Sequence, residues 1–564
     1  MNAGSRKAVA VIAVMGVIAF AVTFAVIVIT QNVNKPDAQV SEESAAAQMD
    51  RLLRRVRVNT LEPVKGNVDL SEANAGGDLP DVDEKYPPGA RAATADYIDI
   101  MSSTEKATDS ASDRWLLDMA ERFNRSGATV NGRDVSVQVR GIASGAGMDY
   151  ILSGKYVPDA FTPSNELWGD ALAAGGVSLT LAEPRLCGNV AGIALSRAKA
   201  DEVSSKYGSI SMKTITQAVT AGELNFGYTN PFASSTGANF LMSTLYSLSP
   251  DDPFSDESVS AFEDFQANVP FVAYTTLQMK EAAKSGVLDG FVFESQQFAN
   301  TPDLRDYVLT PFGVRHDSPV YALGNLSAEK REILDMFITF CKSPDSQEAA
   351  SRFGFNQHDG YVCEIAGLSG KDLSAAQKLY KEKKNQGREV MAVFVADISG
   401  SMDGAPLARL KESLTKGAKF IGSDVSVGLV TFSNDVNIAV PIGKFDIGQR
   451  SLFAGAIEEM DANGGTAMYD AILVAEDMLW KARQTNPGAK LMLFVLTDGE
   501  TNRGADLSEV RPVISGLRAP IYTIGYNADI KALQEVSAIN EAASINADTA
   551  DVVYQLQSLF NAEM

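Results

Sequence analysis

The sequence predicts an α/β protein with two folded domains behind an apolar N-terminal segment. Two continuous apolar runs, Met391–Ala396 and Lys490–Leu496, are typical of parallel strands buried on both faces. Over residues 91–385, strand-like runs alternate with helical patterns across polar turns, which indicates parallel sheets covered by helices. A chain of 564 residues also exceeds what one hydrophobic core usually supports.

The composition excludes some classes of partner and site. The chain holds 71 Asp and Glu residues against 49 Lys and Arg residues, a net charge of −22, so we expect no nucleic-acid partner. It has only two histidines and three cysteines, and no CxxC pair, so a structural zinc site is not expected. Cys187, Cys341 and Cys363 allow one disulfide or none, and the sequence alone does not choose between these alternatives.

Residues 8–30 form an uncharged apolar stretch that is long enough to cross a bilayer as a helix. Arg6 and Lys7 precede it, which favours a cytoplasmic N-terminus at residues 1–7 and an extracytoplasmic location for the rest of the chain. A cleaved signal peptide is the alternative, although the bulky end of the stretch lacks a small-x-small cleavage site. We therefore expect a single-pass protein of the cell membrane.

A stalk is expected over residues 31–90. Ser41–Val58 has the pattern of a helix with apolar residues among arginines, which would be solvated or lie on anionic lipid. Residues 60–90 carry four prolines, a Gly-Gly pair and many acids, which is typical of an extended linker. The two folded domains are then expected at 91–385 and 388–564.

The first elements of the middle domain follow the α/β pattern. We expect a strand at Ala95–Ile100, a helix with one apolar face at Asp113–Phe123, and a second strand at Val135–Val139. A polar, glycine-rich turn then leads into a helix from Met148. A lysine- and glutamate-rich helix, Leu373–Lys384, ends the domain.

Polar side chains follow the two apolar runs of the C-terminal domain. The first run leads into Asp397, Ser399 and Ser401, and the second into Asp498, while Thr466 lies between them just before a helix. Ligands of doubly wound α/β folds bind at the carboxyl ends of the strands, so we expect these side chains to converge. Their oxygens suit a hard divalent cation: magnesium, with manganese or calcium as alternatives. A partner's carboxylate could complete the coordination shell.

These positions resemble the metal-ion-dependent adhesion site of the von Willebrand factor A family, whose pattern is DxSxS…T…D. All five positions match, and the segments Val425–Ser433 and Pro520–Tyr526 resemble core strands of that family. The resemblance covers about residues 388–564. It implies a doubly wound, Rossmann-like domain that binds a protein partner through an acidic residue at the metal. The alternative is that the polar residues only cap their loops.

Residues 91–385 resemble bacterial extracellular solute-binding proteins of the two-lobed periplasmic-binding type. The segments that carry this resemblance are Ile142–Met148, Val157–Ser164, Phe226–Gly237 and Ser343–Phe355. It implies a cleft between lobes, where helix N-termini and hydroxyls would bind a small-molecule or anionic solute. The candidate ligand-binding residues are Ser103, Thr104, Ser144, Asn230, Ser235 and Thr236. Each of them could instead only cap a helix.

Catalytic motifs are missing from the sequence, which has no GxSxG elbow, no phosphate loop and no HExxH. We therefore do not expect an enzyme, and a metal-dependent hydrolase is a distant alternative. The leading hypothesis is a bacterial cell-surface protein that binds or adheres to a protein partner through the metal site. The alternative is a receptor of a transport or sensing system, in which the middle domain captures a solute and the C-terminal domain is a docking module.

Overall fold

The computed structural model describes residues 40–68, 79–269, 271–273, 279, 288–385, 388–499, 501–526, 530–537, 539, 544–546, 556 and 559–560. The expected cytoplasmic N-terminus, 1–7, and the expected transmembrane segment, 8–30, lie outside these residues. Among the helices of the described residues, none is both long and apolar enough to cross a membrane.

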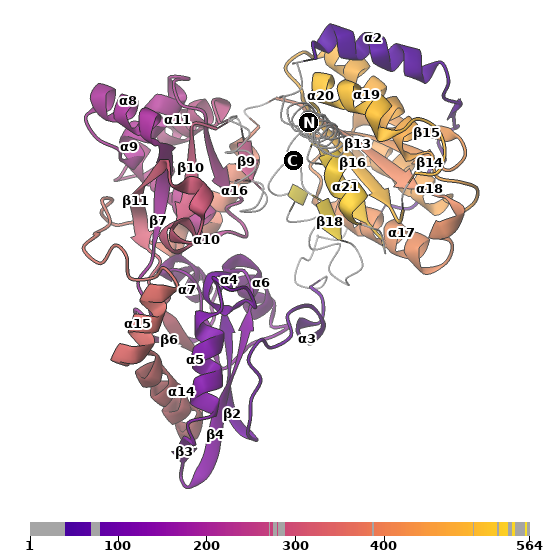
Figure 1. Ribbon diagram of the computed structural model, residues 1–564. Helices are drawn as coiled ribbons and strands as arrows, with labels where there is room; N and C mark the ends of the chain where they lie inside the picture. Colours follow the sequence, from indigo (N-terminus) through magenta and orange to yellow (C-terminus); the bar gives the residue numbers. More distant parts are fainter. Residues whose placement is uncertain are drawn as a thin grey trace, which may run out of the picture.

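A seven-stranded sheet forms the centre of the C-terminal domain (Figure 1). Its strand order is β1-β15-β14-β13-β16-β17-β18, and the pair β14–β15 is antiparallel while the other pairs are parallel. The strands are β1 (Val58–Thr60), β13 (Val390–Asp397), β14 (Ser426–Phe432), β15 (Val436–Lys444), β16 (Lys490–Thr497), β17 (Ile521–Gly525) and β18 (Ser544–Asn546). The helices are α2 (Glu42–Leu53), η4 (Gly400–Met402), α17 (Ala405–Gly417), η5 (Ala418–Phe420), α18 (Ile447–Glu458), α19 (Met468–Thr485), α20 (Leu507–Leu517) and α21 (Ile530–Ser537).

Helices cover both faces of this sheet, as the apolar runs predicted. Even-numbered residues of β13, such as Phe394, pack with α17 and α18. Odd-numbered residues of the same strand, such as Val393, pack with α2, α19 and α20. Successive side chains of a strand point to opposite faces, so a strand with helices on both sides must be apolar at every position.

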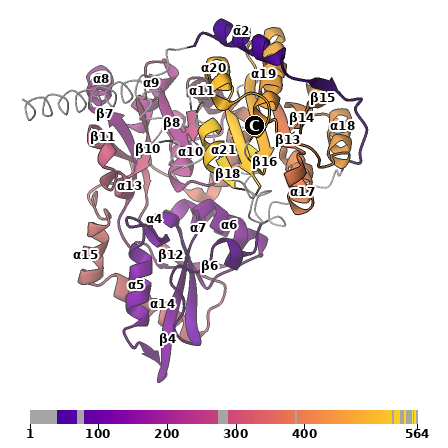
Figure 2. The same ribbon diagram turned by 45° about the vertical axis from the view of Figure 1, so that its right-hand side comes forward.

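The prediction of a free stalk is wrong for residues 40–68, because this segment packs on the C-terminal domain. Helix α2 forms where a helix was expected, but it buries Ala45 and Met49 against α19 and α20 instead of lying in solvent or on lipid (Figure 1). Strand β1 then pairs in parallel with β15 and forms the edge of the sheet. Further along, the N–H of Gly66 donates to the carbonyl of Ser451 at α18 over 2.8 Å. In Figure 2 the indigo segment after α2 runs past β15 and α18.

The middle domain has two lobes, each built on its own sheet (Figure 1). Lobe 1 has the strand order β3-β4-β2-β5-β12-β6, and lobe 2 has the order β11-β7-β10-β8-β9. The strands of lobe 1 are β2 (Asp96–Ser102), β3 (Thr129–Val130), β4 (Arg133–Gly141), β5 (Ala160–Thr162), β6 (Leu179–Glu183) and β12 (Val320–Leu323). The strands of lobe 2 are β7 (Val190–Ser196), β8 (Phe226–Thr229), β9 (Phe271–Ala273), β10 (Gly290–Glu294) and β11 (Tyr307–Arg315).

Helices flank both sheets of the middle domain. Those of lobe 1 are α3 (Val82–Lys85), α4 (Thr104–Ala107), α5 (Trp115–Asn124), α6 (Ser144–Ser153), α7 (Glu166–Ala174), α14 (Ala328–Cys341), α15 (Pro344–Arg352) and the short η3 (Gly370–Asp372) against α7. Those of lobe 2 are α8 (Arg197–Tyr207), α9 (Met212–Thr220), α10 (Ser235–Leu248), α11 (Asp256–Ala267), α13 (Ser295–Ala299), η2 (Pro302–Leu304) and α16 (Leu373–Lys383), which packs on α10 and α11. The expected elements of this domain are present, except that α6 begins at Ser144 and not at Met148.

The chain passes between the two lobes through residues 184–189 and 316–319, and again after α15 to reach α16. The lobes also touch directly. The indole N–H of Trp168 on α7 donates to the Ser235 hydroxyl on α10 over 2.8 Å. At Gly145, a Cβ atom would lie 2.1 Å from the carbonyl oxygen of Phe232, so only glycine fits at this contact.

All three cysteines are unpaired thiols. Burial raises the pKa of Cys187 to about 12 and holds that of Cys341 well above its usual range. Buried protonated thiols behave as small apolar side chains. Of the two alternatives that the sequence left open, the structure therefore has the one without a disulfide.

Candidate functional sites

The candidate metal site lies where β13 and β16 end. These strands are parallel neighbours, and Ala396 is paired with Leu496, so the residues that follow each strand emerge side by side. Both strands are buried along their lengths, and the polar residues begin where the apolar runs stop. The expected convergence of Asp397 and Asp498 at one edge of the sheet therefore follows from the strand register.

A chain of hydrogen bonds joins the first and last loops of this site. The Asp397 carboxylate accepts from the backbone N–H of Ser399 over 2.8 Å and from the hydroxyl of Thr497. The hydroxyls of Ser399 and Ser401 lie 3.1 Å apart. The Ser401 hydroxyl donates to the Asp498 carboxylate over 2.9 Å. Four of the five expected residues are thus within one connected network.

Thr466 lies in the loop that packs between these two segments. The N–H of Gly400 donates to the carbonyl of Gly464 over 3.0 Å, which places the Thr466 loop against the Ser399–Ser401 turn. The backbone N–H of Thr466 donates to the Asn502 side chain over 2.9 Å, and its carbonyl accepts from the hydroxyl of Thr501 over 2.8 Å. The backbone of Thr466 is therefore held by the loop that follows Asp498.

Supporting residues of this site were not found in the sequence. Thr497 positions Asp397, Asn502 positions Thr466, and Asn434 accepts from the N–H of Gly465 over 2.9 Å. Thr497 stands next to Asp498 at a strand end, so the strand register could have indicated it. Asn434 and Asn502 lie in loops with no motif of their own, so only the tertiary structure reveals their role.

The electrostatics of the site are those of one fully buried carboxylate, Asp397, and one partly buried carboxylate, Asp498. Burial raises the pKa of Asp397, hydrogen bonds from Thr497 and Ser399 oppose this, and the nearby charge of Asp498 raises it further. Burial also raises the pKa of Asp498, against the hydrogen bond from Ser401. A bound cation would relieve both effects. Asp397 is fully buried, whereas Ser401 is exposed, so the network opens to solvent at Ser401.

The donor set fits a hard cation. All the side chains brought together offer hydroxyl or carboxylate oxygens, which are the ligands of magnesium and calcium. The described residues contain no group of three or more His, Cys, Asp or Glu side chains that could hold a metal. A metal at this edge of the sheet would therefore depend on the hydroxyls of Ser399, Ser401 and Thr466 in addition to the two carboxylates.

A cavity of about 330 Å³ lies between the lobes of the middle domain. Its lining side chains are mostly hydroxyls, and five of the six expected ligand-binding residues are among them. The lining residues are Ser103, Thr104, Glu105, Ala143, Ser144, Ser164, Thr229, Ala233, Ser234, Ser235, Thr236, Glu294 and Gln297. Its size is at the lower end of the range for small-molecule pockets.

Asn230 is the expected residue that does not line this cavity. It is buried, and its side-chain oxygen accepts from the N–H of Phe232 over 2.9 Å. Its carbonyl accepts from the N–H of Ser234 over 2.9 Å. Asn230 therefore shapes the turn that carries the hydroxyls of α10 to the cavity.

Charged residues at the cavity were missed in the sequence. Glu105 accepts from the hydroxyl of Ser103 and pairs with the fully buried Lys106 at 3.2 Å. Burial raises the pKa of Glu105, but the Lys106 charge and the hydrogen bonds outweigh this and hold it below its usual range. Glu294 ends the apolar strand β10 as Asp397 ends β13, so the same pattern of a carboxylate at a strand end could have indicated it.

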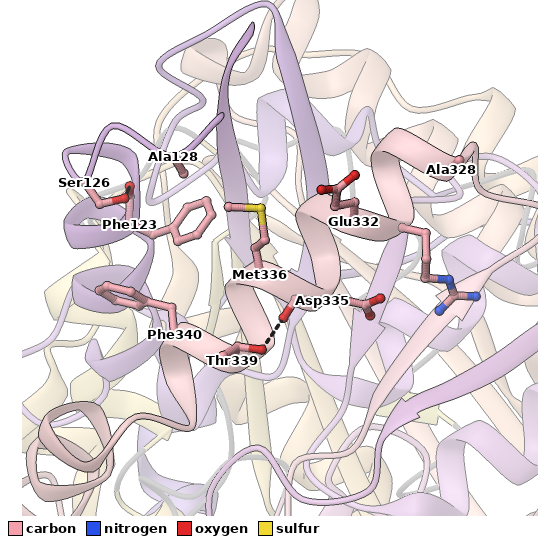
Figure 3. A pocket seen from close by; sticks show the side chains of 10 residues that line it. Phe123, Ser126, Ala128, Ala328, Glu332, Asp335, Met336, Thr339 and Phe340 are labelled. Carbon is pink, nitrogen blue, oxygen red and sulfur yellow. Dashed lines mark hydrogen bonds between the residues drawn. The ribbon is translucent and has the colours of Figure 1, made fainter. Parts of the chain in front are cut away.

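A shallow groove of about 760 Å³ lies on lobe 1 between α5 and α14 (Figure 3). Phe123, Met336 and Phe340 form its apolar part, and Glu332 and Asp335 line it along α14. None of the residues expected from the sequence to bind a metal or a solute lines it. Its charged groups, Arg331, Glu332 and Asp335, all lie along α14 and do not converge, which distinguishes it from the inter-lobe cavity.

The fold and the two sites define a modular binding protein, with an open oxygen-rich site at a sheet edge and a polar cavity between two lobes. Residues 392–562 match the family described as von Willebrand factor type A domain, and residues 108–356 match the family described as bacterial extracellular solute-binding protein. The chain thus combines a von Willebrand factor A domain with a solute-binding domain, and both matched segments lie within the ranges expected for them.

Curated relatives match the C-terminal part. Inter-alpha-trypsin inhibitor heavy chain H3 of Bos taurus is 30% identical over 183 residues, which are 30% of this chain and 20% of that protein. Heavy chain H4 of Homo sapiens is 29% identical over 184 residues, 30% of this chain and 19% of that protein. The match therefore spans about a fifth of the length of these relatives.

Solved structures resemble each domain separately. Iron-bound HitA from Pseudomonas aeruginosa aligns with a TM-score of 0.36 at 15% identity, covering 51% of this chain and 99% of that one. A von Willebrand factor type A protein from Catenulispora acidiphila aligns with a TM-score of 0.27 at 21% identity, covering 30% of this chain and 42% of that one.

Proposed function

We propose that the C-terminal domain binds a divalent cation, magnesium in the first place, and through it an acidic residue of a protein partner. Manganese or calcium are the alternative cations. The observation that carries this proposal is the hydrogen-bonded series Ser399–Ser401–Asp498, which opens to solvent beside the buried Asp397. When bound, the cation would supply a positive charge for a partner's carboxylate.

The mixture of ligands supports binding to a partner. Ser399, Ser401 and Thr466 are neutral, so a cation held partly by hydroxyls keeps more of its charge than one surrounded by carboxylates. The exposed Ser401 lies on the side from which a partner can approach. We propose a binding function and not catalysis for this site.

The test is cation-dependent capture of partners by the full chain, with direct cation binding measured by calorimetry. Asp397→Ala should abolish both cation binding and cation-dependent capture. Asp403→Asn is the matched control, because it removes an exposed carboxylate two residues after Ser401 and should change neither. Partner binding that survives both chelator and Asp397→Ala would contradict the mechanism.

A second proposed function is capture of a small solute by the middle domain. It is supported by the cavity of about 330 Å³ and by the hydroxyls from both lobes that line it. A solute that stabilises the protein in a thermal-shift screen, with the effect reduced by Thr104→Val at the cavity, would support solute capture.

The solute-binding domain indicates an extracellular or periplasmic location. We propose that residues 8–30 anchor the chain in the cell membrane and that the rest of the chain lies outside.

A further inference from the structure

The inter-lobe cavity holds a carboxylate that no described cationic side chain neutralises. Glu294 ends β10, is 6% exposed and lines the cavity. Its oxygens accept from Asn189 over 2.7 Å, from His316 over 2.8 Å and from Thr236 over 3.3 Å. No described Lys or Arg forms an ion pair with it. Buried charges in proteins are normally paired, so a countercharge is missing here.

Glu294 is surrounded by hydrogen-bond donors. The side-chain oxygen of Asn189 accepts from the N–H of Gln296 over 3.1 Å, which fixes its amide nitrogen towards Glu294. The other carboxylate oxygen faces the Thr236 hydroxyl, which donates to it, and the ring nitrogen Nδ1 of His316. The Asn189 N–H group can only donate, while the Thr236 hydroxyl can donate or accept, and surroundings rich in donors favour the carboxylate form.

The neighbouring His316 contacts Glu294 through Nδ1 at 2.8 Å, but an imidazole is not a permanent cation as a lysine or an arginine is. Asn239 both donates to the Val314 carbonyl, over 2.9 Å, and accepts from the Val314 N–H, over 3.1 Å, so its amide orientation is fixed. Its nitrogen therefore faces Nε2 of His316, at 3.1 Å, as a donor. The Asn165 amide nitrogen faces the same Nε2, at 2.9 Å. With Nε2 as the acceptor of these amides, the ring proton lies on Nδ1 and that N–H donates to Glu294.

The one buried lysine beside the cavity is already paired. Lys106 directs its ammonium group to Ser103, to Glu105 at 3.2 Å and to the Thr162 carbonyl at 3.0 Å. These three acceptors use its three N–H bonds, and the charge of Glu105 offsets its charge. Glu294 therefore has no lysine or arginine partner among the described residues. The N-termini of α6 and α10 at the cavity contribute about half a positive charge each over their first turns, which is diffuse and forms no ion pair with the carboxylate.

The hydroxyls of the cavity also favour a ligand that donates hydrogen bonds. The Ser103 and Thr236 hydroxyls donate to Glu105 and Glu294, so towards the cavity their oxygens can only accept. The lining residues include no aromatic side chain on which a sugar ring or a quaternary ammonium could stack. A metal ion is disfavoured, since no cluster of metal-ligating side chains surrounds Glu294 among the described residues.

We infer that the solute captured in this cavity carries a primary ammonium group, which lies against Glu294 and the hydroxyl oxygens of the lining. This inference rests on the proposed solute-binding function and replaces the anionic solute expected from the helix N-termini alone. The N–H groups at the start of α10 remain available for an acceptor group on the same solute.

The experiment measures binding of four matched four-carbon probes to the full chain by calorimetry and thermal shift. The probes are 1,4-diaminobutane, 4-aminobutanoate, butane-1,4-diol and succinate. At least one of the two amines should bind, and the diol and succinate should not. Glu294→Gln should weaken amine binding about 10- to 100-fold, because a hydrogen bond to a charged group is lost.

A second variant keeps Glu294 and its partners intact. Gln297 lines the cavity, so Gln297→Lys brings a cation to it and should also abolish amine binding, whereas Gln297→Met, of similar length and uncharged, should retain it. Binding of succinate or the diol without either amine would overturn the inference but leave solute capture standing. Equal amine binding in Gln297→Lys would overturn the inference as well. Failure of all four probes would count against both proposals.

Discussion

Glu476 makes the stability of the C-terminal domain depend on pH. This residue lies on α19, the helix that follows the Thr466 loop, and its side chain is 1% exposed. One of its carboxylate oxygens has no hydrogen-bond partner. Burial raises its pKa from 4.5 to about 8. The folded domain therefore holds a proton there that the unfolded chain releases above its ordinary pKa.

The sign and size of the effect follow from linkage. The folded-state pKa is raised, so stability is greatest below the unfolded pKa of 4.5 and is lost as pH rises towards about 8. One pKa unit corresponds to about 1.4 kcal/mol, so about 3 kcal/mol should be lost between roughly pH 5 and pH 7.5. Glu476→Gln removes the titrating group and should remove this loss.

The assay follows the unfolding transition of the C-terminal domain in urea at several pH values. A chelator is present so that metal binding does not contribute. The difference in unfolding free energy between wild type and Glu476→Gln should change by about 3 kcal/mol across roughly pH 5 to 7.5. Glu459→Gln, which alters an exposed carboxylate of the same domain, should leave the wild-type slope unchanged. A wild type and Glu476→Gln with parallel pH profiles would refute the reasoning.

Other predictions concern the N-terminal segment, the buried ion pair and the topology. Met49→Ala should destabilise the C-terminal domain by about 2 to 5 kcal/mol in urea unfolding, since Met49 is fully buried against it; an unchanged midpoint would contradict the packing of α2. Lys106→Met should destabilise the middle domain by about 3 to 5 kcal/mol, because Glu105 stays buried without its partner, and a melt at the wild-type temperature would argue against the pair. Protease added to intact cells, or to spheroplasts, should digest the chain beyond residues 8–30; complete protection of the C-terminal domain would reverse the proposed orientation.

Local sequence pattern predicted the centre of the C-terminal domain well. The run around Phe394 is apolar at every position, and only a strand with helices on both faces requires that. The convergence of Asp397 and Asp498 follows from the same parallel strands. In each case the signal is within a few residues of the position that it predicts.

Contacts between distant parts of the chain were not predictable in this way. Asn59 donates to Asn437, 378 residues further on, and no property of Val58–Thr60 indicates β15 as its partner. The proline-rich composition after Thr60 suggested a linker, yet extended backbone also suits a segment that runs along a domain surface. At the cavity, the roles of Glu294 and His316 depend on donors from several separate elements, which sequence spacing does not reveal.

The position of residues 40–68 changes how the two domains are connected. Because β1 belongs to the C-terminal sheet, the middle domain is an insertion between β1 and β13. The incoming connection is fixed to lobe 1, where Tyr150 donates to the Pro80 carbonyl over 2.9 Å. The outgoing helix α16 packs on α10 and α11 of lobe 2, where Gln377 donates to the Pro231 carbonyl over 2.9 Å. The C-terminal domain is therefore joined covalently to both lobes, and a change in lobe closure would move these two connections relative to each other. Two domains in simple tandem order would share only one connection.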